Sequence, residues 1–165
     1  QQLRDRLFEP LGMERAGFGP PGDREAVTQP WGHVGRGEAS KSMFHDNPSA
    51  LGPAGTVHAS LRDWAKFAAM HLGVVRADAL LTSAALSELH TPPESGPYAH
   101  GWVVTKRRWA EGPILTHSGS NTLWYCVAWL APSARFAVLV TCNHGDGAAA
   151  CDAAAAACIR RYAID

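Results

Sequence analysis

The feature that most constrains the fold is a series of β-prone segments near the end of the chain. Four runs rich in Val, Ile, Trp, Tyr, Phe and Thr cover residues 98–109, 114–118, 123–130 and 136–142. These residue types favour strands. The turns between the runs are so short that they can join neighbouring strands only as antiparallel hairpins. The Ala-rich segment 148–162 follows and is predicted to be a helix that covers one face of the sheet.

The first third of the chain has a different character. Residues 4–11 resemble the end of an amphipathic helix, which Pro10 and Gly12 stop. Residues 18–55 are rich in Pro, Gly and polar side chains and show little periodicity. A loop of that length is unusual inside a compact domain. We therefore expect an extended segment that packs on another part of the protein, within or outside this sequence.

Two helices are predicted between this segment and the sheet. Ser60 is a good N-cap with Asp63 in the first turn, and apolar residues follow at helical spacing until Gly73. A shorter helix is expected to begin after Thr82 and to run to His90, before two prolines. We expect Asp63 and Lys66 to lie on a solvated face of the first helix.

These elements predict an α+β fold, with an antiparallel meander of about four strands and a C-terminal covering helix. Two helices and a long loop precede the meander. A chain of 165 residues is long enough for one domain with a real core. We expect a single domain over residues 1–165, with a helical and loop portion at 1–97 and the sheet and last helix at 98–165.

Charge and apolar content exclude several functions. Lys plus Arg and Asp plus Glu number 15 each, so the net charge is zero and predicts no nucleic-acid partner and no anionic membrane surface. No apolar run has the length of a membrane span. Cys126 and Cys142 fall on strands expected to be neighbours, which leaves a disulfide open, although buried free thiols are the simpler interpretation.

Eight histidines raise the question of a metal site. No pair has His-x-x-x-His spacing, and no two cysteines have Cys-x-x-Cys spacing. We therefore predict no metal site, and nothing in the sequence indicates another cofactor.

The segment from His117 to Asn121 carries the clearest chemical signal. A side chain that donates hydrogen bonds at His117 and a hydroxyl at Ser118 can hold a carbonyl or anionic oxygen, and Gly119 permits close approach of a substrate. Ser-Gly-Ser-Asn is also good turn chemistry, and Asn121 is also suited simply to cap the turn. Trp124 fits a substrate cleft and a core position equally well.

Three blocks of residues resemble the distal half of one family. They are Arg6 to Met13 with Gly17 and Phe18, then Gly52 to Val57 with Ser60 to Phe67, and finally Tyr98, Gly101, Trp102, His117 to Asn121, Trp129 to Pro132 and Asn143. In this order and spacing they resemble β-lactamase-like serine hydrolases, which include class C β-lactamases, D-alanyl-D-alanine carboxypeptidases, D-aminopeptidases and esterases. The resemblance implies part of a β-lactamase/transpeptidase-like fold.

The family uses three elements: Ser-x-x-Lys, Tyr-x-Asn or Ser-x-Asn, and Lys-Thr-Gly or a variant. His117-Ser118-Gly119 matches the third in its His form, and no match to the other two occurs in this sequence. The resemblance makes His117 and Ser118 catalytic, makes the Ser120 N–H one of two oxyanion donors, and assigns Gly119, Asn121 and Trp124 to substrate binding. It also implies that a missing N-terminal segment carries the nucleophile, so we expect this chain to be nearly inert alone.

Two functions follow from the resemblance. The first is the C-terminal segment of a serine hydrolase that transfers acyl groups from small ester or amide substrates, with β-lactams and D-amino-acid peptides included. His in place of Lys at position 117 favours esters and aminopeptidase-like substrates. The alternative is a non-catalytic pseudoenzyme or truncated binding module. The resemblance implies a periplasmic or secreted location, and a cytoplasmic one stays open. We also expect self-association, because the incomplete sheet should have an exposed edge.

Overall fold

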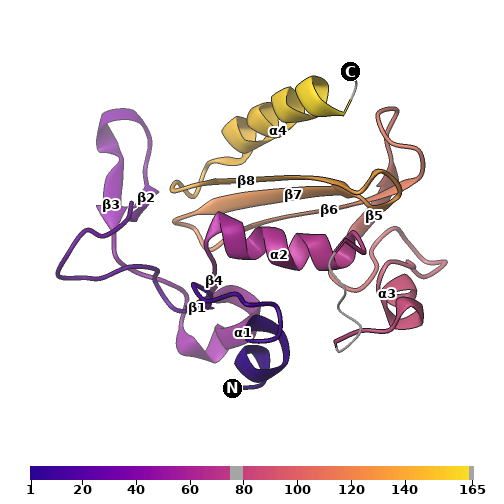
Figure 1. Ribbon diagram of the computed structural model, residues 1–165. Helices are drawn as coiled ribbons and strands as arrows, with labels where there is room; N and C mark the ends of the chain where they lie inside the picture. Colours follow the sequence, from indigo (N-terminus) through magenta and orange to yellow (C-terminus); the bar gives the residue numbers. More distant parts are fainter. Residues whose placement is uncertain (75–79, 164–165) are drawn as a thin grey trace.

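Four antiparallel strands form the main sheet of the computed structural model, which describes residues 1–74 and 80–163 (Figure 1). The strands are β5 (Val103–Lys106), β6 (Pro113–Ser120), β7 (Tyr125–Ala131) and β8 (Phe136–Cys142), and they lie in the order β5-β6-β7-β8. The predicted meander and the α+β class are thus confirmed. Tight turns leave each strand beside the next one in the chain, as the spacing required.

A helix covers each face of this sheet (Figure 1). The Ala-rich helix α4 (Ala148–Tyr162) packs on one face and α2 (Leu61–His71) on the other. Side chains of β7 point alternately to the two faces of the sheet. Val127 packs in the hydrophobic cluster under α4, whereas Ala128 and Leu130 pack in the cluster under α2. This alternation explains why β7 is apolar throughout, because both of its faces are buried.

Helix α2 begins where the sequence predicted, since the Ser60 hydroxyl accepts the Asp63 N–H at 3.2 Å. The expectation that Asp63 and Lys66 lie on a solvated face was wrong for Asp63, which is 3% exposed. Its carboxylate accepts the Arg15 N–H at 2.7 Å and the Lys66 ammonium at 2.9 Å. Lys66 also donates to the Gly12 carbonyl. The carboxylate therefore joins α2 to the loop before β1.

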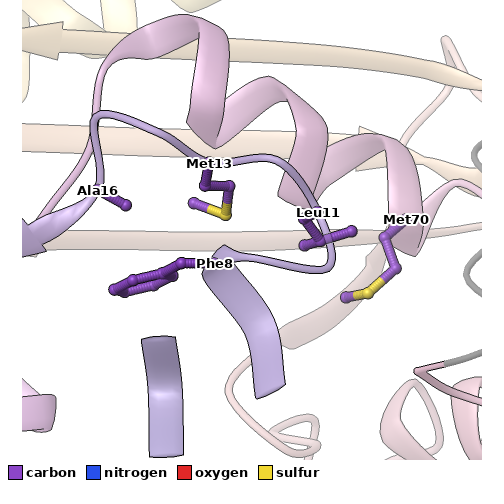
Figure 2. Close-up of a cluster of buried hydrophobic side chains, with 5 residues drawn as sticks. All are labelled: Phe8, Leu11, Met13, Ala16 and Met70. Atoms are coloured by element: carbon purple, nitrogen blue, oxygen red, sulfur yellow. The ribbon is translucent and has the colours of Figure 1, made fainter. Parts of the chain in front are cut away.

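The N-terminal segment packs beneath α2. A short π-helix, η1 (Arg4–Phe8), carries Phe8, which forms a buried cluster with Leu11, Met13, Ala16 and Met70 (Figure 2). Met70 comes from α2, so this cluster fixes the N-terminal turn against the helix. The strand β1 (Gly17–Phe18) then pairs with β4 (Val57–His58) just before α2.

The long segment between β1 and β4 contains structure that the sequence did not predict. It forms a hairpin of β2 (Gly32–Val34) and β3 (Lys41–Met43), together with η2 (Gly37–Ala39), η3 (Ser49–Leu51) and α1 (Gly52–Gly55). The hairpin packs on the end of the main sheet: the His33 N–H donates to the Leu123 carbonyl at 3.0 Å, and the Gly145 N–H donates to the His33 carbonyl at 3.0 Å. The long segment was expected to pack on another part of the protein, and part of that packing surface is the end of the main sheet of this same chain.

The remaining elements are α3 (Ser83–Leu89), which begins after Thr82 as expected and is capped by it, and η4 (Pro132–Ala134) between β7 and β8. Within the described ranges, β8 pairs with β7 alone, so its outer edge is open. Leu61, at the start of α2, is 49% exposed. All four cysteines are free thiols. None of the helices in the described part of the chain combines the length and apolar character that crossing a membrane requires.

Candidate active-site wall

The segment His117–Ser120 forms the distal half of β6. Strand β7 pairs with β6 along residues 115–120, but β5 pairs only with residues 113–116. Because β5 starts at Val103, opposite Thr116, the four residues beyond Thr116 have a free edge in the part of the chain that the structure describes. All four are exposed. Their unpaired backbone groups face open space, where a ligand could accept or donate hydrogen bonds.

Alternation along β6 divides these residues between the two faces of the sheet. His117 lies opposite Ala128, which packs toward α2, and Ser118 lies opposite Val127, which packs toward α4. The Ser118 hydroxyl has no hydrogen-bond partner among the described residues, so it is available to a ligand. It borders a shallow hollow of about 290 Å³ whose other lining residues include Thr116, Trp129 and Asp152.

A tyrosine lies beside His117. The Tyr98 hydroxyl is 3.3 Å from Nε2 of His117, and the two ring centroids are 6.0 Å apart. A bridge between Tyr98 and Val103 places the tyrosine just before β5, and the Val104 N–H donates to the Pro97 carbonyl at 2.8 Å. The sequence pattern included Tyr98 without giving it a role. The contact depends on the course of residues 98–103, which no local motif specifies.

Gly119 is not required by the packing of the chain. A Cβ atom built at Gly119 meets no atom of the described chain within 4 Å, and Gly119 does not have a positive φ. Elsewhere in the same region glycine is necessary: a Cβ at Gly145 would lie 1.9 Å from the Thr122 carbonyl oxygen. The open space at Gly119 is therefore available to something other than this chain.

Cys126 lies opposite Gly119 in the sheet and is the nearest thiol to the wall. Burial raises the pKa of the Cys126 thiol, the backbone of Gly119 acts against that rise, and the neighbouring Cys142 adds to it. A thiol that stays protonated is a poor nucleophile. The raised pKa therefore disfavours a nucleophilic role for Cys126.

The turn after β6 is held by Ser120 and Asn121. The Ser120 hydroxyl accepts the Thr122 N–H at 3.0 Å and donates to the Gly145 carbonyl at 3.4 Å. The Asn121 side-chain oxygen accepts the N–H groups of Leu123 and Trp124 at 3.2 and 3.0 Å. These bonds close the turn and leave the backbone of Ser120 at the edge of the sheet.

Asp46 is a buried carboxylate that the sequence analysis did not identify. It is 8% exposed and accepts hydrogen bonds from the Asn121 side-chain amide and the Asn47 N–H, both at 2.8 Å. Asp46 also lines a larger hollow of about 630 Å³, bordered by Arg24, His45 and other residues of the long segment. The long segment is thereby tied to the turn that follows the wall.

Trp124 packs against the β2–β3 hairpin. A Cβ at Gly32 would come within 2.8 Å of the Trp124 ring, so the two meet at van der Waals contact. The indole ring is only partly buried. The structure thus brings His117, Ser118, Gly119 and Ser120 together along one free edge, with Tyr98 beside them. Asn121 and Trp124 lie just beyond, where they connect the wall to the hairpin.

No three His, Cys, Asp or Glu side chains of the described residues come together as a metal site would require. The groups at the wall are hydroxyls, an imidazole and backbone N–H groups. Such groups hold a carbonyl or an oxyanion by hydrogen bonds.

Comparison with known proteins places these features in a family. A family model described as Beta-lactamase matches residues 1–159. A search of curated proteins found no match. Solved structures do match, but their sequence identities are so low that the likeness shows a shared fold and nothing more.

Three of these structures are representative. A penicillin-binding protein homologue from Pyrococcus abyssi, described as octameric, has 19% identity and a TM-score of 0.66 over 87% of this chain. SurE has 21% identity and a TM-score of 0.75 over 96% of the chain. A D-stereospecific amidohydrolase from a Streptomyces species has 18% identity and a TM-score of 0.65 over 87%. This chain spans 33%, 39% and 43% of their respective lengths. On the match over residues 1–159, the chain belongs to the Beta-lactamase family.

Proposed function

We propose that this chain supplies one wall of a serine hydrolase active site, which a segment carrying Ser-x-x-Lys and the Tyr-x-Asn element completes. Membership of the family supports acyl transfer by a serine as the chemistry. The observation that carries the proposal is the free edge of β6 at residues 117–120, with open space beside Gly119. A wall of this kind needs a nucleophile in front of it, and no Ser-x-x-Lys occurs in the sequence.

Each residue of the wall has a distinct role in this proposal. The Ser120 N–H is one donor to the developing oxyanion, and the nucleophile's own N–H is the second. His117 and Ser118, which face opposite sides of β6, each hold a different polar group of the substrate, and Gly119 leaves room for the substrate backbone. Loss of one oxyanion donor costs about a hundredfold or more in rate. With one donor and no nucleophile, the chain alone is expected to be inert.

Two further residues act at the margin of the site. Both polar ends of the Asn121 side chain are engaged within the chain, so Asn121 contributes by holding the turn that carries Ser120. Trp124 contributes part of its ring face to the substrate. The Tyr98 hydroxyl orients the His117 imidazole, because a hydrogen bond at Nε2 selects among the ring's tautomers and rotations.

The substrate class that fits best is a small ester or a D-amino-acid amide. His117 offers a single ring N–H to a substrate oxygen, whereas a lysine at this position would bring an ammonium group suited to a substrate carboxylate. A β-lactam with its carboxylate is therefore the less favoured substrate. The D-stereospecific amidohydrolase among the matching structures is consistent with this class, at the level of the fold.

The test compares the chain alone with the chain joined to its Ser-x-x-Lys segment. Both are incubated with a chromogenic ester and with a serine-acylating probe, and intact mass locates the label. The joined protein should hydrolyse the ester and take the label on the Ser-x-x-Lys serine, and the chain alone should do neither. A label on a serine of this chain, or a joined protein without hydrolysis, would overturn the proposal. In the second case the non-catalytic binding module becomes the better interpretation.

Variants of the joined protein test the roles of the wall. His117→Ala and Ser118→Ala should each lower kcat/KM at least about tenfold, since each removes a hydrogen bond to the reacting group. His100→Ala is the matched control, because His100 is an exposed histidine outside the wall. Equal activity of His117→Ala and the control would remove His117 from the site. A preference for β-lactams over simple esters would overturn the substrate class alone.

A further inference from the structure

The end of the sheet opposite the wall concentrates positive charge. Antiparallel topology places the end of β5, the start of β6, the end of β7, the start of β8 and the end of α4 at this same end (Figure 1). Six exposed cations come from these segments: Lys106, Arg107, Arg108, Arg135, Arg160 and Arg161. We call this set, with Tyr162, the basic end.

Acidic residues are few in the segments that form the basic end, although Arg161 itself interacts with another group of the protein. Across residues 106–113, 131–136 and 158–165, the sequence has two acidic residues, Glu111 and Asp165. The whole chain has zero net charge, so the remainder is net negative. The charge of the chain is therefore polarised, and the overall balance conceals it. The cations gathered at this end create a local attraction for anions.

Aromatic packing holds the segments of the basic end together. The rings of Trp109 and Phe136 meet edge to face with centroids 6.0 Å apart, and both pack against α4. The Arg107 guanidinium lies 5.4 Å from the centroid of the Trp129 ring. The cations therefore extend from a rigid base instead of from mobile tails, which preserves the charge density of the surface.

We propose that the basic end is a peripheral docking face for an anionic lipid bilayer. Tyr162 is 72% exposed at its margin, and an amphipathic ring beside arginines suits the boundary between lipid headgroups and acyl chains. The Trp109 and Trp129 rings are packed into the structure, which leaves no row of rings on which nucleic-acid bases would stack. Docking in this orientation leaves His117–Ser120 directed away from the bilayer. The inference is independent of the proposed catalytic function.

Vesicle co-sedimentation tests the proposal. The chain should bind vesicles of phosphatidylcholine with phosphatidylglycerol and should not bind pure phosphatidylcholine, and binding should be lost as NaCl rises from about 0.02 M to about 0.5 M. The test variant is Lys106→Glu/Arg108→Glu/Arg160→Glu, which spares the arginines that contact aromatic rings. Each basic residue near such a surface contributes about a factor of five, so the triple variant should bind at least about a hundredfold more weakly.

The matched control is Arg6→Glu/Lys41→Glu/Arg62→Glu, which reverses three exposed cations outside the basic end. It makes the same change in net charge and should bind vesicles nearly as well as the parent chain, and circular dichroism should show both variants folded. Equal loss in the two variants would mean that net charge alone governs binding and would overturn the proposal. So would the absence of binding to anionic vesicles at low salt, or binding to a single-stranded oligonucleotide without binding to vesicles.

Discussion

The side-chain amide of Asn121 donates a hydrogen bond of 2.8 Å to the Asp46 carboxylate, across 75 positions of sequence. Asp46 belongs to the long irregular segment, and Asn121 begins the turn after the wall strand. Asp46 is nearly buried, and its carboxylate also accepts the Asn47 N–H. This bond therefore couples the segment with the least regular structure to the residues that carry the proposed chemistry.

Asn121→Ala should destabilise the chain by about 2 kcal/mol, because the turn loses the acceptor for two N–H groups and a nearly buried carboxylate loses a donor. Chemical denaturation measures this change. In a double-mutant cycle with Asp46→Ala, the two single effects should exceed the effect of the double variant by about 1 kcal/mol. Additive effects would show that the bond contributes nothing in solution. Asn143 also has a side-chain bond to a backbone carbonyl, and Asn143→Ala provides a comparison without Asp46.

Asp63→Ala should cost about 2 kcal/mol of stability, since it removes the buried carboxylate that pairs with the partly exposed Lys66 and leaves the Arg15 N–H without its acceptor. Urea unfolding is the measurement. Asp152→Ala is the control, because Asp152 is an exposed aspartate of α4 and should change stability by less than about 0.5 kcal/mol. A cost at Asp63 no greater than at Asp152 would contradict the buried role.

The same carboxylate predicts a pH dependence. The hydrogen bond from Lys66 lowers the pKa of Asp63 below 3.8, with the Arg15 N–H helping and burial opposing. A lowered folded-state pKa gives stability that is present above pH 3.8 and is lost as the pH falls through the folded-state value. In Asp63→Asn, the free energy of unfolding should therefore fall less steeply below pH 3.8 than it does in the parent chain.

His71 controls stability in a milder range of pH. Burial, and then positive charge at His90, lower the pKa of His71 from 6.5 to about 4; its Nδ1 lies 2.9 Å from Nε2 of His90. Between pH 4 and pH 6.5, His71 is protonated in the unfolded chain and neutral in the folded chain. The free energy of unfolding therefore rises with pH in this range. The chain should lose about 3 kcal/mol between neutral pH and pH 4 from this group.

The measurement is urea unfolding at several pH values with His71→Phe. That variant should lose most of the slope between pH 4 and 6.5, with a remainder from His90, whose pKa burial also lowers. The control is His100→Phe, because His100 is exposed and should leave the slope unchanged. An unchanged slope in His71→Phe would show that another group produces the dependence.

The sheet and its helices were predictable because their signals are local. Runs of β-prone residues between tight turns specify the meander, and the caps at Ser60 and Thr82 specify where two helices begin. The β2–β3 hairpin was not predictable, since each strand has three residues and is held by contacts with the distant end of the sheet. The burial of Asp63 was missed for the same reason, because Arg15, its backbone donor, lies 48 positions away.

The candidate site divides in the same way. His117 to Ser120 could be chosen from their motif, and the structure places them along one strand edge. Tyr98 and Asp46 could not be assigned their contacts, because these arise where residues 98–103 and the long segment return to the wall. Sequence patterns thus indicate which chemical groups the site contains. The residues that hydrogen-bond to those groups are brought to them by the tertiary structure.

Gly119 separates the requirements of folding from those of function. Gly119→Ala should leave stability within about 0.5 kcal/mol of the parent, because the new Cβ meets open space and the backbone needs no positive φ. In the protein joined to its Ser-x-x-Lys segment, the same change should lower kcat/KM at least about tenfold, since the methyl group occupies space kept for the substrate. Gly147→Ala should behave in the opposite way: its Cβ would lie 1.9 Å from the Cys142 sulfur, so stability should fall by about 1–3 kcal/mol. Thermal melts and ester hydrolysis on both variants decide the matter, and a destabilised Gly119→Ala, or one with full activity, would contradict the assignment.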